Sequence, residues 1–174
     1  MPKKKVRWSL WFLRAVLALL LLALTAFGVF QIYILKSIAP LSGEAQLAGL
    51  SSGVEIKRDA SDVTHIYAKT PMDAWRSIGN VHAQERGWQL AFNRQVMHGE
   101  LSEWLGPTTL ETDKLMRTLG IMKSAQAPFD KLPLNPQKAL EAYAEGVHAG
   151  YASAQWRATD FVILGIHSSK TMRP

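Results

Sequence analysis

One uncharged apolar run constrains this chain more than any other feature of its sequence. Residues 15–35 read AVLALLLLALTAFGVFQIYIL, which is 21 positions without a charged side chain. As a helix that rises about 1.5 Å per residue, the run spans about 31 Å, close to the hydrocarbon thickness of a bilayer. Trp8, Trp11 and Tyr33 lie near its ends, where interfacial aromatic residues gather. The run therefore predicts a transmembrane helix.

The distribution of charge predicts how this helix is oriented. Residues 1–36 contain six Lys and Arg and no Asp or Glu, whereas the rest of the chain has fourteen of each kind. The positive-inside rule then predicts a cytoplasmic basic tail over residues 1–14 and a signal-anchor helix over 15–36. Residues 37–174 would lie on the periplasmic side of the inner membrane. Because they carry no net charge, we expect the lipid bilayer as a partner and no nucleic acid.

A cleaved signal peptide is the alternative interpretation of the N-terminus. Its apolar region is usually shorter, about 7–15 residues, and ends in a small-x-small cleavage site. Ala26 is preceded by the large Leu24 at the −3 position, and Ala39 is followed by Pro40, which disfavours cleavage. We therefore favour an uncleaved anchor.

The sequence after the anchor begins with a linker and a hairpin. Residues 37–53 are rich in Ser, Gly and Ala and predict a connector. Val54–Arg58 alternates apolar and polar residues, and Val63–Ala68 is rich in β-formers. The turn-forming residues between these two segments indicate a β-hairpin.

Three helices are expected to follow the hairpin. Thr70 as N-cap and Pro71 at the first helical position predict a helix to about Met97. Further helices are expected over 109–124 and from Asn135 to about 154. The apolar positions expected to face the core are Ala74, Ile78, Val81, Trp88 and Phe92, then Leu110, Leu115, Leu119 and Met122, then Leu140, Tyr143, Val147 and Tyr151. The fold class is thus α+β, and two strands alone predict a fragment of a larger structure.

Some polar residues of the chain could be catalytic groups, although each could also have a structural role. The chain has no cysteine, which excludes disulfides, zinc–cysteine sites and thiol nucleophiles. His82 and Glu85, followed by Arg86, could form half of a metal site or an acid/base pair at i, i+3. The favoured alternative is a buried Glu85 paired with an arginine, and a surface His82.

Other polar residues give weaker signals. His65 with Asp59 or Asp62 and a serine could be written as a triad, but no G-x-S-x-G motif is present, so we favour a polar residue that fixes the hairpin. Glu100 and Glu103 could be paired carboxylates, although a solvated helix start is favoured. Structural roles are likewise expected at the loop serines Ser51, Ser52, Ser168 and Ser169, and at the core tryptophans Trp75, Trp88 and Trp104.

Five ordered segments of the chain read VEIKRDASDVTHIYAKT, DAWRSIGNVHAQERGWQLAFNRQVMHGELSEWLG, TDKLMRTLG, ALEAYAEGVHAGY and DFVILGI. Together they resemble the N-terminal part of penicillin acylase (penicillin amidase) family precursors. The family pattern is matched at Arg58-Asp59, His65-Ile66, Gly79, Ala83-Gln84-Glu85-Arg86, Gly99, Glu103, Gly106, Asp113, Arg117, Gly120, Tyr143, Gly146 and Ala149. The resemblance covers about residues 42–174.

The sequence also departs from the family pattern. Asp62 stands where the family usually has Gly, and Thr64 where it has Pro, which changes the turn chemistry of the hairpin. Further departures are Asn80 for Tyr, Glu85 for Asp, Gly87 for an apolar residue and His148 for Asn. The matching residues Arg58, Glu85 and Arg86 are expected to form ion pairs in the core.

The resemblance implies an N-terminal-nucleophile amidohydrolase with an αββα fold. The precursor would cut itself, and the freed N-terminal Ser of a β chain would attack a linear amide with its own α-amino group as base. Residues 54–174 resemble only the first part of the α chain. The nucleophile, the oxyanion donors and any Ca²⁺ ligands would then lie beyond Pro174, so no catalytic, cofactor-binding or metal-binding residue is expected in 1–174.

Three functional interpretations follow. The first is the N-terminal fragment of a membrane-anchored hydrolase that acts on a β-lactam side chain or an acyl-homoserine lactone, with the rest of its α chain and its β chain as partners. The second is a non-catalytic, membrane-tethered remnant or split α chain that binds a partner polypeptide. The third is an anchored scaffold unrelated to the family. The first predicts that residues 1–174 alone are inactive.

Overall fold

The computed structural model describes residues 8–37, 42–153 and 161–162. The chain divides into two compact units, Met1–Ile38 and Ala39–Pro174, and each is described by itself. Expectations that concern residues 1–7 and Ser168-Ser169 lie outside the described residues.

The first unit is the helix α1, Trp8–Ser37. Most of its described apolar side chains are exposed, for example Leu19 at 66% and Leu24 at 67%, while Val16 and Ile34 are half-buried. The part Leu10–Ser37 is long and apolar enough to cross a membrane, a property that signal sequences share. The expected helix is therefore present. Its role in a membrane and the domain boundaries stay predictions.

The second unit opens with the expected hairpin. Strands β1 (Glu55–Arg58) and β2 (Thr64–Tyr67) pair antiparallel, with Ile56 opposite Ile66. Asp62 adopts a left-handed φ of 61° in the turn, and its N–H donates to Asp59 O at 3.0 Å. The turn is thus kept although Asp replaces the glycine usual in the resembled family.

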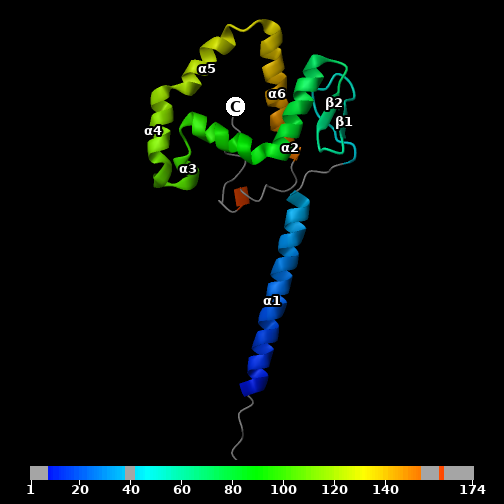
Figure 1. Ribbon diagram of the computed structural model, residues 1–174, viewed down its shortest axis with the longest axis vertical. Coiled ribbons are helices and arrows are strands. Elements are labelled where there is room, and N and C mark those ends of the chain that lie inside the picture. The colour runs from blue at the N-terminus through cyan, green and yellow to red at the C-terminus, as the bar shows by residue number, and fades with distance from the viewer. Residues whose placement is uncertain (1–7, 38–41, 154–160, 163–174) are drawn as a thin grey trace, which may run out of the picture. The chain divides into compact units, whose positions relative to one another are not determined.

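The long helix α2, Pro71–His98, follows the hairpin and organises the unit (Figure 1). Thr70 is its N-cap, as expected, and its Oγ1 accepts a hydrogen bond from the N–H of Asp73 at 3.1 Å. Gly99 ends the helix in a left-handed conformation with φ of 65°. At Arg86 the backbone leaves the helical region (φ −129°, ψ 26°), which kinks α2 near its middle.

Short helices lead away from the end of α2 and α6 returns to it (Figure 1). They are α3 (Ser102–Leu105), the 3₁₀ turn η1 (Pro107–Thr109), α4 (Leu110–Leu119), α5 (Ile121–Asp130) and α6 (Leu134–Ser153). The single helix expected over 109–124 is wrong. Gly120, with a left-handed φ of 64°, ends α4 and begins a second helix.

The main contact of the unit is between α2 and α6. It is made by small residues, because a Cβ on Gly79 would stand 2.1 Å from the Tyr143 carbonyl oxygen, and one on Gly146 would stand 1.9 Å from the Arg76 carbonyl oxygen. A Cβ on Gly150 would stand 2.6 Å from the Cβ of Ala83 and 2.7 Å from the Asn80 carbonyl oxygen. Ala142, Gly146 and Gly150, spaced at i, i+4 and i+8, are the buried residues of α6. The two backbones therefore touch directly.

This contact corrects the expected core faces. The buried residues of α2 are Asp73, Ser77, Gly79, Val81, Ala83, Ala91 and Gln95, so Val81 alone of the expected apolar stripe is buried. The expected stripe of the next segment is exposed at Leu110 (44%), Leu115 (54%), Leu119 (57%) and Met122 (44%), as is Leu140 on α6 (49%). Small side chains win these contacts because only they allow the backbones to approach this closely.

Candidate functional site

Arg58 links the hairpin to α2. Its guanidinium donates to the Asp62 carboxylate at 3.0 Å and to the Glu85 carboxylate on α2. The hydrogen bond that Arg58 donates to Asp62, together with the charge of Glu85, raises the pKa of Arg58. Glu85 is paired with an arginine as expected, but the expectation that it is buried is wrong, since 28% of its side chain is exposed. The pair therefore positions the hairpin near the helix kink.

His65 and Asp59 meet at the hairpin turn. His65 Nε2 lies 3.0 Å from Asp59 Oδ2, while Asp59 Oδ1 accepts the N–H groups of Ser61 and Val63 at 2.8 and 3.0 Å. The hydrogen bond with His65, followed by these backbone donors, lowers the pKa of Asp59. The geometry fits the expected structural role. Among the described residues, no serine hydroxyl is hydrogen-bonded to a histidine.

Asp73 ties the segment before the hairpin to the start of α2. Asp73 is 1% exposed, and its carboxylate accepts the N–H of Ser51 at 2.9 Å and the Ser51 hydroxyl. These bonds lower the pKa of Asp73. One turn later, Arg76 donates to Gly49 O at 2.7 Å and pairs with Glu145 on α6. Ser51 is thus a structural donor to a buried carboxylate.

Asp113 holds the turn after α2 in the same way. It is 3% exposed and accepts the N–H groups of Leu101 and Ser102, both at 2.8 Å. Burial by itself raises the pKa of Asp113, but the hydrogen bonds from Ser102 and Leu101 and the charge of Arg117 together lower it. Arg117 also donates to Gly99 O at 2.8 Å. Asp113 and Arg117 therefore hold the segment between α2 and α3 against α4.

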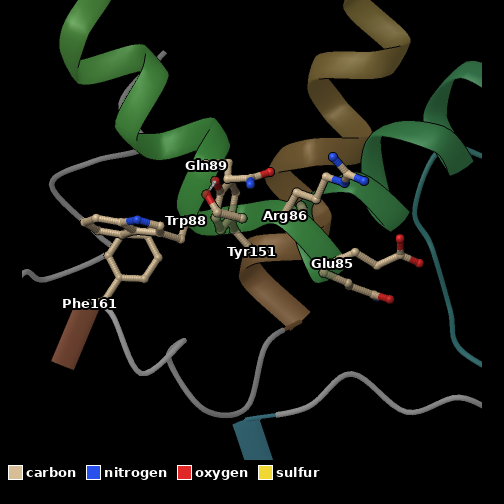
Figure 2. A pocket seen from close by; sticks show the side chains of 9 residues that line it. Glu85, Arg86, Trp88, Gln89, Tyr151 and Phe161 are labelled. Carbon is tan, nitrogen blue, oxygen red and sulfur yellow. Dashed lines mark hydrogen bonds between the residues drawn. The ribbon is translucent and has the colours of Figure 1, made fainter. Parts of the chain in front are cut away.

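A pocket of about 500 Å³ opens where α2 is kinked (Figure 2). Its lining comes from about two turns of α2 around the kink, from Tyr151 on α6 and from Phe161, which follows α6 in the chain. The α2 residues are Ala83, Gln84, Glu85, Arg86, Gly87, Trp88 and Gln89. The Tyr151 hydroxyl donates to the Gly87 carbonyl oxygen. Burial raises the pKa of Tyr151 to about 12. Tyr151 therefore stays a neutral donor at any physiological pH.

One wall of this pocket is aromatic. Trp88 stacks on Trp104 with ring centroids 5.4 Å apart, and Phe161 meets Trp88 edge-to-face at 5.2 Å. Phe161 and Ala91 are each 3% exposed and form the centre of this cluster. Trp88 and Trp104 are half-buried and pack against this centre, so both have the structural role expected of them. Trp75 is not, because it is 45% exposed.

The remaining candidate residues are not brought together. His82 is exposed, as expected, and its Nδ1 lies 3.1 Å from the Tyr143 hydroxyl. Glu103 is exposed on α3, and Glu100 lies between α2 and α3. In the part of the chain that the structure describes, no three His, Cys, Asp or Glu side chains are grouped to hold a metal ion. That 1–174 contains no catalytic or cofactor-binding residue stays a prediction.

The arrangement supplies positioned structure more than reactive groups. Its carboxylates are engaged by N–H and hydroxyl donors, and its pocket offers aromatic faces beside the polar side chains of Gln84, Glu85, Arg86 and Gln89. Sequence reasoning missed the buried roles of Asp73, Asp113 and Phe161. An Asp three residues after a Thr N-cap was the available signal for Asp73. Asp113 is a matched position of the family pattern and Phe161 lies in the segment DFVILGI, but neither match indicated that the side chain is buried.

The chain matches a family model described as penicillin amidase over residues 53–173. It is 37% identical over 129 residues to the penicillin acylase 2 proenzyme of a Pseudomonas species, strain SE83. It is 35% identical over 144 residues to the acyl-homoserine lactone acylase QuiP of Pseudomonas aeruginosa. Each match covers 74% of this chain, yet the chain spans only 17% of the length of either relative.

A solved structure shares the fold. The thermostable penicillin G acylase from Alcaligenes faecalis superposes with a TM-score of 0.59 at 22% identity, covering 66% of this chain and 63% of that one. This likeness confirms an arrangement similar to penicillin acylase for the second unit, mostly helical with a short two-stranded sheet in the described residues. The αββα architecture of a whole enzyme stays a prediction.

Proposed function

Because this chain belongs to the penicillin amidase family, we propose that it is the N-terminal part of a membrane-anchored amidohydrolase precursor. The family-model match over residues 53–173 carries this proposal, because it covers most of this chain. The chain itself spans only 17% of the length of the relatives named above. The reaction would be hydrolysis of a linear amide into an acyl group and an amine. One relative is named as a penicillin acylase and another as an acyl-homoserine lactone acylase. These names support penicillins and acyl-homoserine lactones as the two candidate substrate classes.

The catalytic chemistry would come from residues outside this chain. A β chain would supply the N-terminal Ser nucleophile, its α-amino base, the oxyanion donors and any Ca²⁺ site. The described residues would contribute the scaffold. Ser51 is hydrogen-bonded to Asp73, and His65 to Asp59, so the imidazole of His65 is not arranged to activate the hydroxyl of Ser51. These contacts support a scaffold role for the described residues.

We propose that α1 anchors this scaffold in the inner membrane. The exposed apolar surface of Leu10–Ser37 and the basic residues before it support an uncleaved, single-pass anchor with 37–174 in the periplasm. A cleaved signal sequence remains the competing assignment for the same helix.

The experiment that tests this function is sequencing of the gene beyond the codon for Pro174, in all three frames. We expect the rest of an α chain and then a junction that opens a long β chain with Ser. An immediate stop with no such sequence in any frame would remove the hydrolase proposal. Purified 1–174 should also show no amide hydrolysis of penicillin G or an acyl-homoserine lactone, and turnover above background would place the nucleophile within this chain.

A non-catalytic partner-binding chain is the second candidate. The observation that favours it is the exposed apolar set on α4 and α5, formed by Leu110, Leu115, Leu119 and Met122. Exposed apolar residues gathered on neighbouring helices are typical of surfaces that bind another polypeptide. Co-purification of a separately encoded β part with 1–174 would support this role. A stable chain that carries no bound polypeptide would oppose it.

A further inference from the structure

Thr25, Gln31 and Tyr33 carry the polar side-chain groups within the uncharged run of α1, and those of Thr25 and Gln31 differ in how they are satisfied. The Thr25 hydroxyl donates to the Leu22 carbonyl oxygen at 2.8 Å, within its own helix. Gln31 is exposed, and among the described residues its carboxamide is seen to make no hydrogen bond. A carboxamide offers two N–H donors and one acceptor oxygen. In hydrocarbon, such a group is stabilised only by a partner that provides both.

Gln31 lies on a regular face of α1. Leu17, Leu21, Leu24, Gly28, Gln31 and Leu35 follow one another at alternating spacings of four and three residues. At about 100° per residue, they fall within about 40° on either side of one line along the helix. We call these six residues the Gln31 face. Alternation of four and three is the spacing of a helix seam that packs against another helix.

Gly28 makes this face suited to close contact beside the amide. Nothing lies within 4 Å of where its Cβ would stand, and it precedes Gln31 by about one turn. Small residues at such positions let two helices in a bilayer approach closely enough for side-chain hydrogen bonds. At about 1.5 Å per residue, Gln31 lies roughly 6 Å inside the end of the uncharged run. Its amide therefore lies within the hydrocarbon.

We infer that α1 pairs with α1 of a second copy of this chain, in parallel, through the Gln31 face. The inference rests on the anchor proposed above. A second copy is the fitting occupant because two-fold pairing places Gln31 opposite Gln31, and each amide then supplies the donor and the acceptor that the other requires. The shared orientation set by the basic N-terminus keeps the two amides at the same depth.

The absence of cysteine makes a direct test possible. In the otherwise cysteine-free full chain, Leu24→Cys places one thiol on the Gln31 face, and Ala26→Cys places one at nearly the same depth on the opposite side of the helix. Membranes containing each variant are washed with carbonate and oxidised, and the dimer fraction is read on a non-reducing gel. We expect a disulfide-linked dimer for Leu24→Cys and little for Ala26→Cys.

Changes at Gln31 separate the amide from the apolar seam. In the Leu24→Cys chain, Gln31→Leu should weaken association about 3- to 25-fold, the range of one interhelical hydrogen bond, while Gln31→Asn should retain it. Equal cross-linking of Leu24→Cys and Ala26→Cys, or cross-linking only to other proteins, would overturn the pairing. A chain that stays in carbonate-washed membranes without a dimer overturns the pairing alone. A chain released by carbonate overturns the anchor and the pairing with it.

Discussion

Three carboxylates stabilise the irregular parts of the second unit. Each accepts backbone N–H groups from a segment that lacks helix or strand partners, where an unpaired N–H would cost free energy. The pairs are Asp59 with Ser61 and Val63, Asp73 with Ser51, and Asp113 with Leu101 and Ser102. All three have a lowered pKa in the fold. At the scale of single residues, ionised aspartates therefore accept the backbone N–H groups that a helix or a strand would otherwise pair.

The lowered pKa of Asp73 predicts a dependence of stability on acid. Since the unfolded carboxyl titrates near its ordinary value of 3.8, the stabilisation is complete above that pH and is lost as the pH falls through the lower folded pKa. We expect the difference in Tm between the wild type and Asp73→Asn to shrink below about pH 4. The measurement is thermal unfolding of the full chain in detergent by circular dichroism.

The control for Asp73 is Glu44→Gln, at an exposed position of the segment before the hairpin. Its difference from the wild type should stay small and nearly constant over the same range of pH. A difference for Asp73→Asn that does not change below about pH 4 would contradict the role of its carboxylate.

Asp62 tests the strain in the hairpin turn. A non-glycine residue in the left-handed region costs about 1–2 kcal/mol, and Asp bears this better than Ala because its short polar side chain bonds locally. We therefore expect Asp62→Ala to lower the free energy of unfolding by about 1 kcal/mol, and Asp62→Gly to restore it. Chemical denaturation of both variants checks this. An Asp62→Ala chain as stable as Asp62→Gly would show that the turn carries no such strain.

Contacts between secondary-structure elements centre on the crossing of α2 and α6. Gly79, Gly146 and Gly150 bring the two backbones together. The kink at Arg86 changes the direction of α2 near its middle (Figure 1). Glycine in a helix interior is unfavourable by about 1 kcal/mol relative to alanine. Its presence at the crossing therefore reflects the close approach of the helices.

Gly146→Ala measures this close approach. The added Cβ would meet the Arg76 carbonyl at 1.9 Å, a backbone atom that cannot move aside alone. We expect a loss of about 1–3 kcal/mol in stability, despite the better helix propensity of alanine. The control Ala144→Gly, at an exposed position of α6, should cost about 1 kcal/mol through propensity alone. A Gly146→Ala chain more stable than the wild type would contradict the crossing.

Tyr151 tests how the kink of α2 is stabilised. Its hydroxyl satisfies the Gly87 carbonyl next to the kink, so Tyr151→Phe should lower stability by about 1 kcal/mol. Tyr143→Phe is the matched change on the same helix. It removes only the contact with the exposed His82 and should have a smaller effect. Equal losses in urea unfolding would show that the kink does not depend on the Tyr151 hydroxyl.

The whole chain contains the apolar helix α1 and a second unit of the penicillin amidase family, and it spans 17% of the length of the relatives named above. The apolar residues of α4 and α5 that remain exposed fit a unit that spans 17% of the length of its relatives. In a larger assembly such residues gain free energy by burial, about 25 cal/mol per Å² of apolar surface. Their exposure therefore accords with a scaffold that needs further polypeptide.

Deletion of residues 1–37 tests the anchor at this scale. We expect the full chain to sediment with membranes after a carbonate wash and the deleted chain to appear in the soluble fraction, because the apolar surface of α1 is removed. The assay is fractionation followed by immunoblotting of a C-terminal tag. If expression of the full-length chain instead yields a shortened product in the soluble fraction, this would indicate a cleaved signal sequence.

The sequence alone determined the features that depend on near neighbours in the chain. The apolar run gave the helix α1, the alternation around Asp59 gave the hairpin, and Thr70-Pro71 gave the start of α2. Caps, turns and periodicity are local because the groups that satisfy them lie within a few residues. The ordered family motifs are likewise contained in short segments of the sequence.

Only the tertiary structure decided which faces are buried and which charges meet. Apolar spacing is the same whether a helix face packs or stays exposed, so Leu115 was expected inside and lies outside, while Gly146 forms the core contact. Glu85 pairs at the surface with Arg58, 27 positions earlier in the chain. Asp113 is a buried acceptor for the N–H groups of Leu101 and Ser102, which lie 12 and 11 positions before it. These outcomes depend on which segments approach one another, and that is set by the packing of the whole unit.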